Sequence, residues 1–200
     1  MVRRTFGDPD FSMRLNLGCG GDKRDGWVNV DKYDAAAPDQ LVDLEAFPWP
    51  WDDDSVEQIL LKHVLEHLGR DPDVYLNIFK ELWRVCRAGA EIEIVVPHPR
   101  HDSFLNDPTH VRAVTPEGLQ MFSRKENRKW QREKLANTPL GLYIDVDFDV
   151  AKVDMTPAEP WRTQFRKGKL KPAELNDAMR RFNNVILETN VVLKVVKPLR

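Results

Sequence analysis

Short apolar segments, several of them alternating with polar residues, recur along the first half of the chain. Alternation with a period of two is the signal of a half-buried strand, and a short unbroken apolar run is typical of a strand buried on both faces. Asp71, Pro72 and Asp73 form a helix start, and the apolar residues behind them recur at helical spacing up to Cys86. Strands that alternate with helical segments indicate a parallel sheet. The predicted strands are residues 13–17, 27–31, 41–43, 58–62 and 90–96.

Longer alternating segments follow in the second half. Residues 144–150 and 185–195 are predicted to form an antiparallel pair at one edge of the sheet. Residues 155–184 lie between them as an insertion, with a helix near residues 173–182. We therefore expect a single α/β domain over residues 1–200, with a mostly parallel seven-stranded sheet, an antiparallel edge pair and helices on both faces.

Composition narrows the class of protein. No apolar run approaches the roughly 20 residues needed to span a bilayer, so we expect no membrane span. Residues 1–8 carry charge without an apolar stretch behind them, so we expect no signal peptide. The two cysteines are too few for a disulfide framework, and a cytoplasmic location is the expectation.

Charge is unevenly distributed, although the formal net charge is only −2. In residues 1–100, 19 acidic residues outnumber 12 basic ones, and in residues 101–200, 18 basic residues outnumber 13 acidic ones. An acidic first half suits a cationic ligand and a basic second half suits an anionic one, unless both are simply solvated surface.

A glycine turn follows the first predicted strand, and a carboxylate ends the second. Gly18 and Gly20 let the backbone approach a ligand, and Asp31 can accept hydrogen bonds from the hydroxyls of a ribose. The turn lacks the third glycine of the dinucleotide fingerprint and the lysine of a phosphate loop, and Asp22 and Asp25 disfavour a pyrophosphate. This corner therefore predicts a nucleoside ligand with a cationic group and argues against a nucleotide-dependent oxidoreductase.

Five segments, in their order along the chain, resemble those of class I S-adenosylmethionine-dependent methyltransferases, which have a Rossmann-like fold. The segments are Leu15-Asn16-Leu17-Gly18-Cys19-Gly20, Asp43-Leu44 before Phe47-Pro48-Trp49, His63-Val64-Leu65-Glu66-His67-Leu68, Glu81-Leu82-Trp83-Arg84-Val85 and Ile92-Glu93-Ile94-Val95-Val96-Pro97. The resemblance covers roughly residues 13–122. The chain is similar in particular to short methyltransferases of this class that are encoded among polysaccharide and lipopolysaccharide biosynthesis enzymes. Those proteins share the segments at residues 26–31 and 106–112.

The resemblance implies S-adenosylmethionine as the cofactor, bound by residues 13–96. The methionine part of the cofactor would contact Gly18, Cys19 and Gly20. Asp31 would hold the ribose, and Asp43 with Leu44 would lie at the edge of the adenine. His63 would lie beside the methionyl end. Two departures from the family pattern stand out. Residues 18–26 leave room for only a rudimentary first helix, and residues 87–90 replace the usual Lys-Pro-Gly-Gly turn.

All five histidines lie between residues 63 and 110, after the fourth and fifth predicted strands, where a parallel sheet binds its ligands. His98 and His110 are the candidates for a base that takes a proton from the acceptor. For these two and for His101, catalytic, metal-binding and structural roles all remain open. His63 and His67 match the zinc pattern H-x-x-E-H, but we do not expect that pair to form a zinc site in a nucleoside fold, and we assign no metal ligand.

Two segments, 97–138 and 155–184, are too long to be plain connectors and are predicted to form a lid over the acceptor. Their basic residues, together with Trp130, favour an anionic small-molecule or carbohydrate acceptor, with a nucleic acid as a less favoured alternative. A noncatalytic cofactor-binding subunit is the other alternative. The sequence does not determine the identity of the acceptor, the choice between O- and N-methylation, or the oligomeric state.

Overall fold

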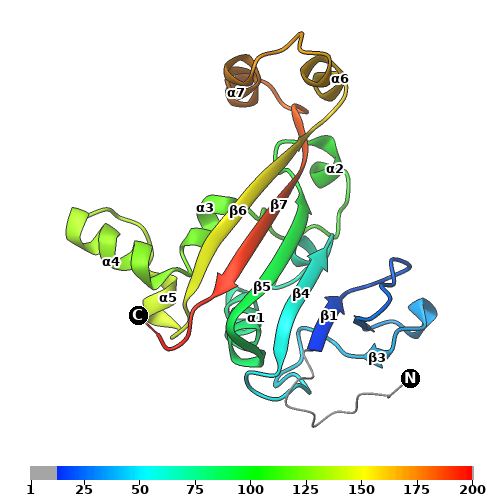
Figure 1. The fold of residues 1–200 in the computed structure, drawn as a ribbon, viewed down its shortest axis with the longest axis vertical. Coiled ribbons are helices and arrows are strands. Elements are labelled where there is room, and N and C mark those ends of the chain that lie inside the picture. The colour runs from blue at the N-terminus through cyan, green and yellow to red at the C-terminus, as the bar shows by residue number, and fades with distance from the viewer. Residues whose placement is uncertain (1–12, 200) are drawn as a thin grey trace.

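The computed structural model describes residues 13–199, so the expectation drawn from residues 1–8 concerns a segment outside the described part. At its centre is a seven-stranded sheet in the order β3-β2-β1-β4-β5-β7-β6 (Figure 1). The first five strands are parallel, and β7 pairs antiparallel with both β5 and β6, as predicted. The strands are β1 (Met13–Leu17), β2 (Val28–Asp31), β3 (Gln40–Leu41), β4 (Val56–Lys62), β5 (Cys86–Pro97), β6 (Phe148–Pro157) and β7 (Ile186–Val195).

The longest helix among the described residues is α1 (Pro72–Val85), and it begins as the sequence indicates, because the Asp71 side chain accepts from the Asp73 N–H. No helix within residues 13–199 combines the length and the apolar character needed to cross a membrane. The shorter helices are the 3₁₀ turns η1 (Asp34–Ala36) and η2 (Leu65–His67), and α2 (Asp102–Leu105), α3 (Pro116–Gln120), α4 (Arg124–Glu133), α5 (Leu140–Tyr143), α6 (Trp161–Arg166) and α7 (Pro172–Arg181).

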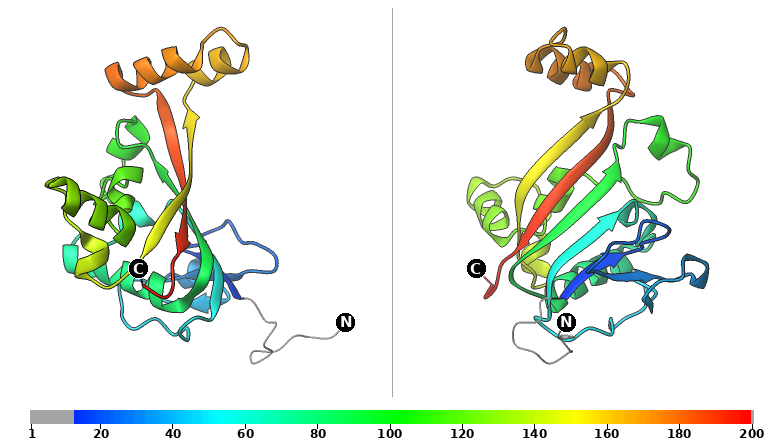
Figure 2. Two further views of the ribbon diagram at one scale, coloured as in Figure 1. Left: turned by 60° about the vertical axis from the view of Figure 1, so that its left-hand side comes forward. Right: turned by 45° about the vertical axis from the view of Figure 1, so that its right-hand side comes forward.

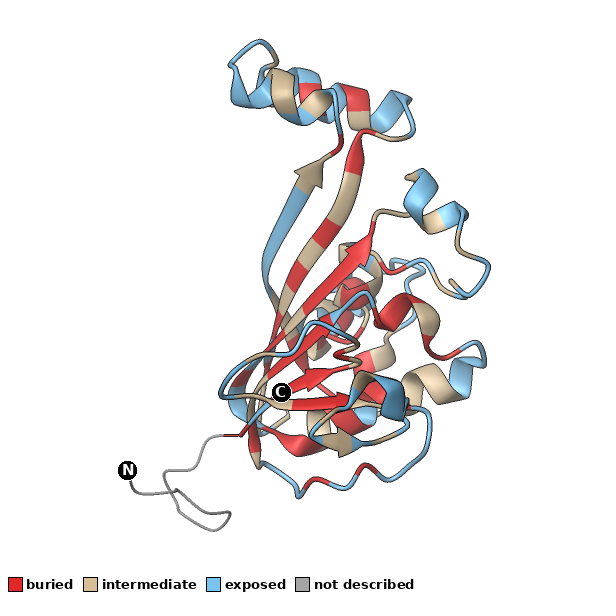
Figure 3. Ribbon diagram, turned by 90° about the vertical axis from the view of Figure 1, so that its right-hand side faces the viewer, coloured by how far each residue is buried: buried red, intermediate tan, exposed pale blue. Residues whose placement is uncertain are grey.

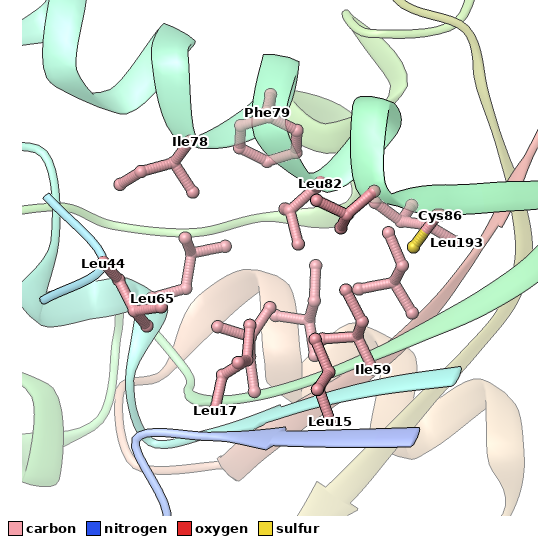
Figure 4. Close-up of a cluster of buried hydrophobic side chains, with 14 of the residues drawn as sticks. Leu15, Leu17, Leu44, Ile59, Leu65, Ile78, Phe79, Leu82, Cys86 and Leu193 are labelled. Atoms are coloured by element: carbon pink, nitrogen blue, oxygen red, sulfur yellow. The ribbon is translucent and has the colours of Figure 1, made fainter. Parts of the chain in front are cut away.

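The main hydrophobic core lies between α1 and one face of the sheet. Leu15 of β1 and Ile59 of β4 point toward Phe79 and Leu82 of α1 (Figure 4). Phe79 also stacks on Phe122, with the ring centroids 3.8 Å apart. This stack fixes the segment that contains α3 against α1, so α3 joins the helical layer on this face (Figure 2).

On the opposite face of β1, the short connection formed by residues 18–27 takes the place of a helix. The buried Asn16 side chain donates to the Asp22 carbonyl oxygen at 2.7 Å and to Asn29 Oδ1 at 3.0 Å. Asn29 Oδ1 also accepts from the Arg24 N–H at 2.8 Å. The two asparagine side chains therefore hold this helix-free connection in place, and the expectation that a first helix is at most rudimentary is confirmed.

The hairpin of β6 and β7 extends beyond the end of β5 and carries α6 and α7 at its tip (Figures 1 and 2). The middle of β6, residues 151–155, is exposed, whereas β5 is buried over its last residues, 94–97 (Figure 3). The tip has a small core of its own, built from Leu175, Ala178, Val185 and Ile186. The predicted helix near residues 173–182 is confirmed as α7.

Two strand starts predicted from the sequence are wrong. β5 begins at Cys86 rather than at residue 90, because α1 already ends at Val85. The alternation over residues 144–150 predicts a strand there, but β6 begins at Phe148 and runs to Pro157. The Val146 N–H donates to the Gly141 carbonyl oxygen, so this backbone is bonded to α5 rather than to a neighbouring strand. Ile144 and Val146 still pack in the main core, but Asp147 beside Val146 is buried as well, so the alternation is not that of a strand with one solvent face.

Candidate functional site

Two adjacent pockets lie where the carboxyl ends of the parallel strands meet. The first pocket has a volume of about 220 Å³ and is lined by Gly18, Asp31, Lys32, Tyr33, Val42, Asp43, Leu44, His63, Val64, His67 and Leu68. The second, which we call the histidine pocket, has a volume of about 330 Å³ and is lined by His63, Glu66, His67, Pro97, Ser103, Asp107, His110, Leu187 and Glu188. His63 and His67 line both, so the two pockets share a wall.

The glycine turn after β1 forms one end of the first pocket. Gly18 has a φ of 64°, and a Cβ atom at this position would lie 2.5 Å from Cγ2 of Val64. Gly18 is therefore required both for its left-handed backbone and for lack of space. The Gly20 N–H donates to Asp31 Oδ2 at 2.9 Å, which ties the turn to the end of β2.

The Asp31 carboxylate is held in place by backbone donors. Oδ2 accepts from the Gly20 N–H, and Oδ1 accepts from the Tyr33 N–H at 3.0 Å. Each carboxylate oxygen has a second lone pair, so Asp31 keeps acceptor capacity toward the pocket that it lines. Such a group is suited to accept from two neighbouring hydroxyls.

Apolar side chains form the rest of the first pocket. Leu44 and Val64 are buried, and Val42 and Leu68 complete an apolar slot beside the carboxylates. Asp43, at the entrance, accepts from the Glu45 N–H at 2.9 Å. A flat apolar ring with a polar edge fits this combination of groups.

Most of the residues predicted to bind the cofactor line the first pocket, but two do not. Cys19 is buried, and its burial raises the pKa of the thiol, with the Asp31 charge adding to the effect. Gly20 contributes through its backbone donor rather than as a lining residue. The lining residues among the predicted set are Gly18, Asp31, Asp43, Leu44 and His63.

Sequence reasoning missed several lining residues. Lys32 and Tyr33 follow Asp31 directly, and this closeness to a predicted ribose-binding residue could have identified them as part of the pocket. Val64 and Leu68 come from the apolar positions of the segment that contains His63 and His67. Apolar side chains are more often core residues than ligand contacts, so their type gave no signal of a binding role.

His63 lies at the junction of the two pockets. Its φ of 55° is in the left-handed region, which a non-glycine residue adopts at a cost and which is frequent at functional sites. Nδ1 lies 3.5 Å from Glu66 Oε1, and Nε2 lies 3.5 Å from Glu188 Oε2. The interaction with Glu66 raises the pKa of His63, against an opposing effect of burial.

The histidine pocket brings together residues from two distant parts of the sequence. His67 Nδ1 lies 2.9 Å from Thr109 Oγ1, and His110 Nδ1 lies 2.8 Å from the Phe104 carbonyl oxygen. The two imidazole rings contact each other edge to face, with centroids 4.6 Å apart. The Glu66 side chain is 1% exposed and completes the group.

The two candidate catalytic residues are placed differently. His110 lines the histidine pocket, and its side chain is 7% exposed. His98 is absent from the lining of both pockets; its Nδ1 accepts from the Arg100 N–H, and burial lowers its pKa. His101 caps α2, because its Nδ1 accepts from the Ser103 N–H at 3.0 Å.

The basic segments lie outside the two pockets. Trp130 of α4 is 8% exposed, so it is packed against the protein and its ring is not free to stack on a base or a sugar. The basic residues of α4, α6 and α7 sit on these peripheral helices. Among the lining residues of both pockets, Lys32 is the one lysine and there is no arginine.

No family model and no curated protein matches the sequence. Solved structures do match the fold. A SAM-dependent methyltransferase from Archaeoglobus fulgidus is 17% identical, with a TM-score of 0.62 over 92% of this chain and 86% of that chain. A SAM-dependent methyltransferase from Methanosarcina mazei is 14% identical, with a TM-score of 0.53 over 94% and 93% of the two chains.

The [4+2]-cyclase SpnF also matches, at 13% identity and a TM-score of 0.50 over 94% of this chain and 76% of that one. At these identities the likeness shows the fold. The chain has the Rossmann-like fold of class I methyltransferases, with the predicted mostly parallel sheet and antiparallel edge pair.

Proposed function

We propose that this protein is an S-adenosylmethionine-dependent methyltransferase. The observation that carries the proposal is the Asp31 carboxylate, held by the Gly20 and Tyr33 N–H groups beside a glycine turn, at the ligand-binding edge of the sheet. The two SAM-dependent methyltransferases of the same fold support the choice of cofactor.

The lining of the first pocket fits the parts of this cofactor. Asp31 would hold the ribose, and the apolar slot of Val42, Leu44 and Leu68 would take the adenine, with Asp43 at its edge. Gly18 would let the methionine part lie against the backbone. Acidic lining favours a positively charged sulfonium over a pyrophosphate.

Methyl transfer places modest chemical demands on the protein. The bound cofactor supplies an electrophilic methyl group on a positively charged sulfur. The protein holds the acceptor in line with that group and keeps water out, which is catalysis by positioning. His63 and His67, which line both pockets, would stand between the cofactor and the acceptor.

The histidine pocket is the place for the acceptor. Its lining carries the carboxyl groups of Glu66, Asp107 and Glu188, and no lysine or arginine. Carboxylates accept hydrogen bonds from hydroxyl groups, so this lining supports a carbohydrate acceptor over an anionic one. The basic charge that favoured an anionic acceptor belongs to the peripheral helices.

Two alternatives make predictions that differ from those of the proposal. The basic residues of α4, α6 and α7 would suit a nucleic-acid acceptor, which predicts transfer that weakens steeply as salt is raised. The fold alone also fits a noncatalytic cofactor-binding subunit. That alternative predicts cofactor binding without formation of S-adenosylhomocysteine for any acceptor.

The test begins with calorimetry. S-adenosylmethionine should bind at one site per chain, and Asp31→Ala should weaken binding by about 1–3 kcal/mol, the scale of lost charge-assisted hydrogen bonds. Asp25→Ala is the matched control, because Asp25 is exposed and absent from the pocket lining. Binding of NADH without binding of S-adenosylmethionine would contradict the proposal.

A screen of sugars with methyl-labelled cofactor then addresses the acceptor. His110→Ala should lower turnover while leaving cofactor affinity nearly unchanged, because His110 lines the histidine pocket but not the first pocket. If His110→Ala lowered cofactor affinity as much as turnover, the assignment of His110 to the acceptor side would be wrong.

A further inference from the structure

Three side chains of the histidine pocket form a group that could hold a metal ion. Glu66, His67 and His110 each offer one ligand atom, and these atoms all lie within 4.8 Å of one another. Glu66 and His67 belong to η2, directly after β4, whereas His110 comes from the segment after α2. The fold joins these parts, because the Glu66 carbonyl oxygen accepts from the N–H groups of Val111 and Arg112.

The Glu66 carboxylate lacks the partners that a buried charge requires. The side chain is 1% exposed, and neither Oε1 nor Oε2 has a hydrogen-bond partner. The nearest group that can carry a positive charge is the imidazole of His63, whose Nδ1 lies 3.5 Å from Oε1. This exposed histidine, at a distance too long for a good hydrogen bond, compensates the buried carboxylate only in part, and a bound cation is a group that would compensate it fully.

Hydrogen bonds give His67 the tautomer that a metal ligand needs. The Thr109 hydroxyl donates to Asp107 Oδ1 at 2.6 Å, so toward His67 it can only accept. His67 Nδ1, at 2.9 Å from Thr109 Oγ1, therefore carries a proton, and in the neutral imidazole Nε2 keeps its lone pair. Asp107 thus orients the ring of His67 through Thr109, an arrangement typical of metal-binding histidines.

His110 is prepared in the same way. Its Nδ1 lies 2.8 Å from the Phe104 carbonyl oxygen, which can only accept, so Nδ1 carries a proton and, in the neutral imidazole, Nε2 keeps its lone pair. His110 Nε2 lies 3.8 Å from Asp107 Oδ2. Both imidazoles therefore present an unprotonated nitrogen, and an acidic side chain stands beside one of them.

We propose that Glu66, His67 and His110 bind a divalent transition-metal ion. Two imidazoles and one carboxylate suit zinc and the neighbouring transition metals better than magnesium or calcium, which prefer oxygen ligands. Three protein ligands leave coordination positions open for a substrate. The site differs from the H-x-x-E-H pair of the sequence, because His63 is not one of the three ligands.

The role of the ion rests on the proposed function. The ion would supply a Lewis acid that makes an acceptor hydroxyl easier to deprotonate, and Glu188 in the pocket wall would take that proton. The oxygen then attacks the methyl carbon, the carbon–sulfur bond breaks, and its electron pair stays on sulfur. The products are a methyl ether and S-adenosylhomocysteine, and His110 acts as a ligand rather than as a base.

Binding of ZnCl₂ to chelator-treated protein tests the site directly. Calorimetry should give one zinc ion per chain, and CoCl₂ should give the visible absorption bands of a low-coordinate site. Glu66→Gln and His110→Ala should each weaken zinc binding at least about tenfold, and Thr109→Val should weaken it less, because it alters only the orientation of His67. His101→Asn is the matched control: asparagine preserves the cap of α2 and removes an imidazole outside the group.

Melting temperatures distinguish a variant that has lost the metal site from one that folds poorly. Glu66→Gln should raise the melting temperature of the metal-free protein, because it removes a buried charge, and should abolish the further rise that ZnCl₂ causes in the wild type. Zinc binding that survives Glu66→Gln and His110→Ala, or less than one ion per chain, would overturn the proposal.

Calorimetry with S-adenosylhomocysteine separates the two proposals. Zinc binding without S-adenosylhomocysteine binding would refute the proposed function and leave the metal site standing. S-adenosylhomocysteine binding without zinc binding would refute the metal site and leave the function standing.

Discussion

The backbone conformation of the glycine turn depends on single residues. Gly18 and Gly20 both have positive φ angles, of 64° and 48°, but their surroundings differ. A Cβ atom on Gly18 would overlap Val64, whereas a Cβ atom on Gly20 would meet nothing within 4 Å. Because Val64 also lines the first pocket, packing at Gly18 and the shape of the pocket are coupled.

Gly18→Ala should therefore destabilise the protein by about 1–3 kcal/mol, the cost of a non-glycine residue in the left-handed region, increased by the overlap with Val64. Denaturant unfolding measures this change, and cofactor affinity should fall as well. Gly21→Ala is the control, because Gly21 has no positive φ and open space around it. Equal stability of the two variants would contradict this account of the turn.

At the scale of elements, the tip of the β6–β7 hairpin is tied to the segment that borders the histidine pocket. Arg100 Nη1 donates to the Met179 carbonyl oxygen at 2.8 Å, and Arg100 Nε donates to Asn183 Oδ1 at 3.2 Å. The Asp102 N–H donates to Asn184 Oδ1 at 2.8 Å. These bonds connect α7 and the end of the tip to α2, and α2 contributes Ser103 to the pocket lining.

The hydrogen bonds between Arg100 and the hairpin tip make the predicted lid, formed by segments 97–138 and 155–184, testable. Hydrogen exchange should show S-adenosylhomocysteine protecting both segments as well as residues 15–67. Arg100→Ala should remove the protection of 155–184 and keep that of 15–67, because it breaks the bonds to α7. Arg162→Ala, an exposed cation of α6, is the control. Protection confined to residues 15–67 in the wild type would contradict the lid.

For the molecule as a whole, a partly buried ion pair within α1, Arg84 with Glu81, binds the backbone of the loop after β3. Arg84 donates to both carboxylate oxygens of Glu81, at 2.7 and 2.8 Å, and Glu81 Oε2 also accepts from the Trp49 N–H. Arg84 further donates to the carbonyl oxygens of Trp49 and Trp51. Burial alone would raise the pKa of Glu81, but these hydrogen bonds and the Arg84 charge outweigh it and lower the pKa.

Stability should therefore depend on pH through Glu81. A depressed pKa in the folded state contributes stability that is present above the ordinary glutamate pKa of about 4.3 and is lost as pH falls below it. Glu81→Gln should be less stable than the wild type at pH 7, and the difference should shrink on acidification, by at most about 1.4 kcal/mol per pH unit. Urea unfolding from pH 7 to pH 3 measures this, with the exposed Glu133→Gln as control. A difference that does not vary with pH would contradict the assignment.

Local patterns in the sequence were sufficient for much of the fold and for part of the first pocket. Apolar periodicity and the Asp71 cap predicted the strands and α1, because these signals depend on residues a few positions apart. Gly18 and Asp31 were identified for the same reason, since a turn and a strand end are local features. The parallel sheet then brought them to one edge.

The tertiary structure decided what local patterns could not contain. The strand predicted over 144–150 shifted, because its backbone bonds to α5, and Trp130 turned out to be buried. Glu66 and His110 are far apart in the sequence, and they meet because the Glu66 carbonyl oxygen accepts from the backbone that follows His110. Which histidines lie together depends on such long-range hydrogen bonds, and these exist only once the sheet and its connections have folded.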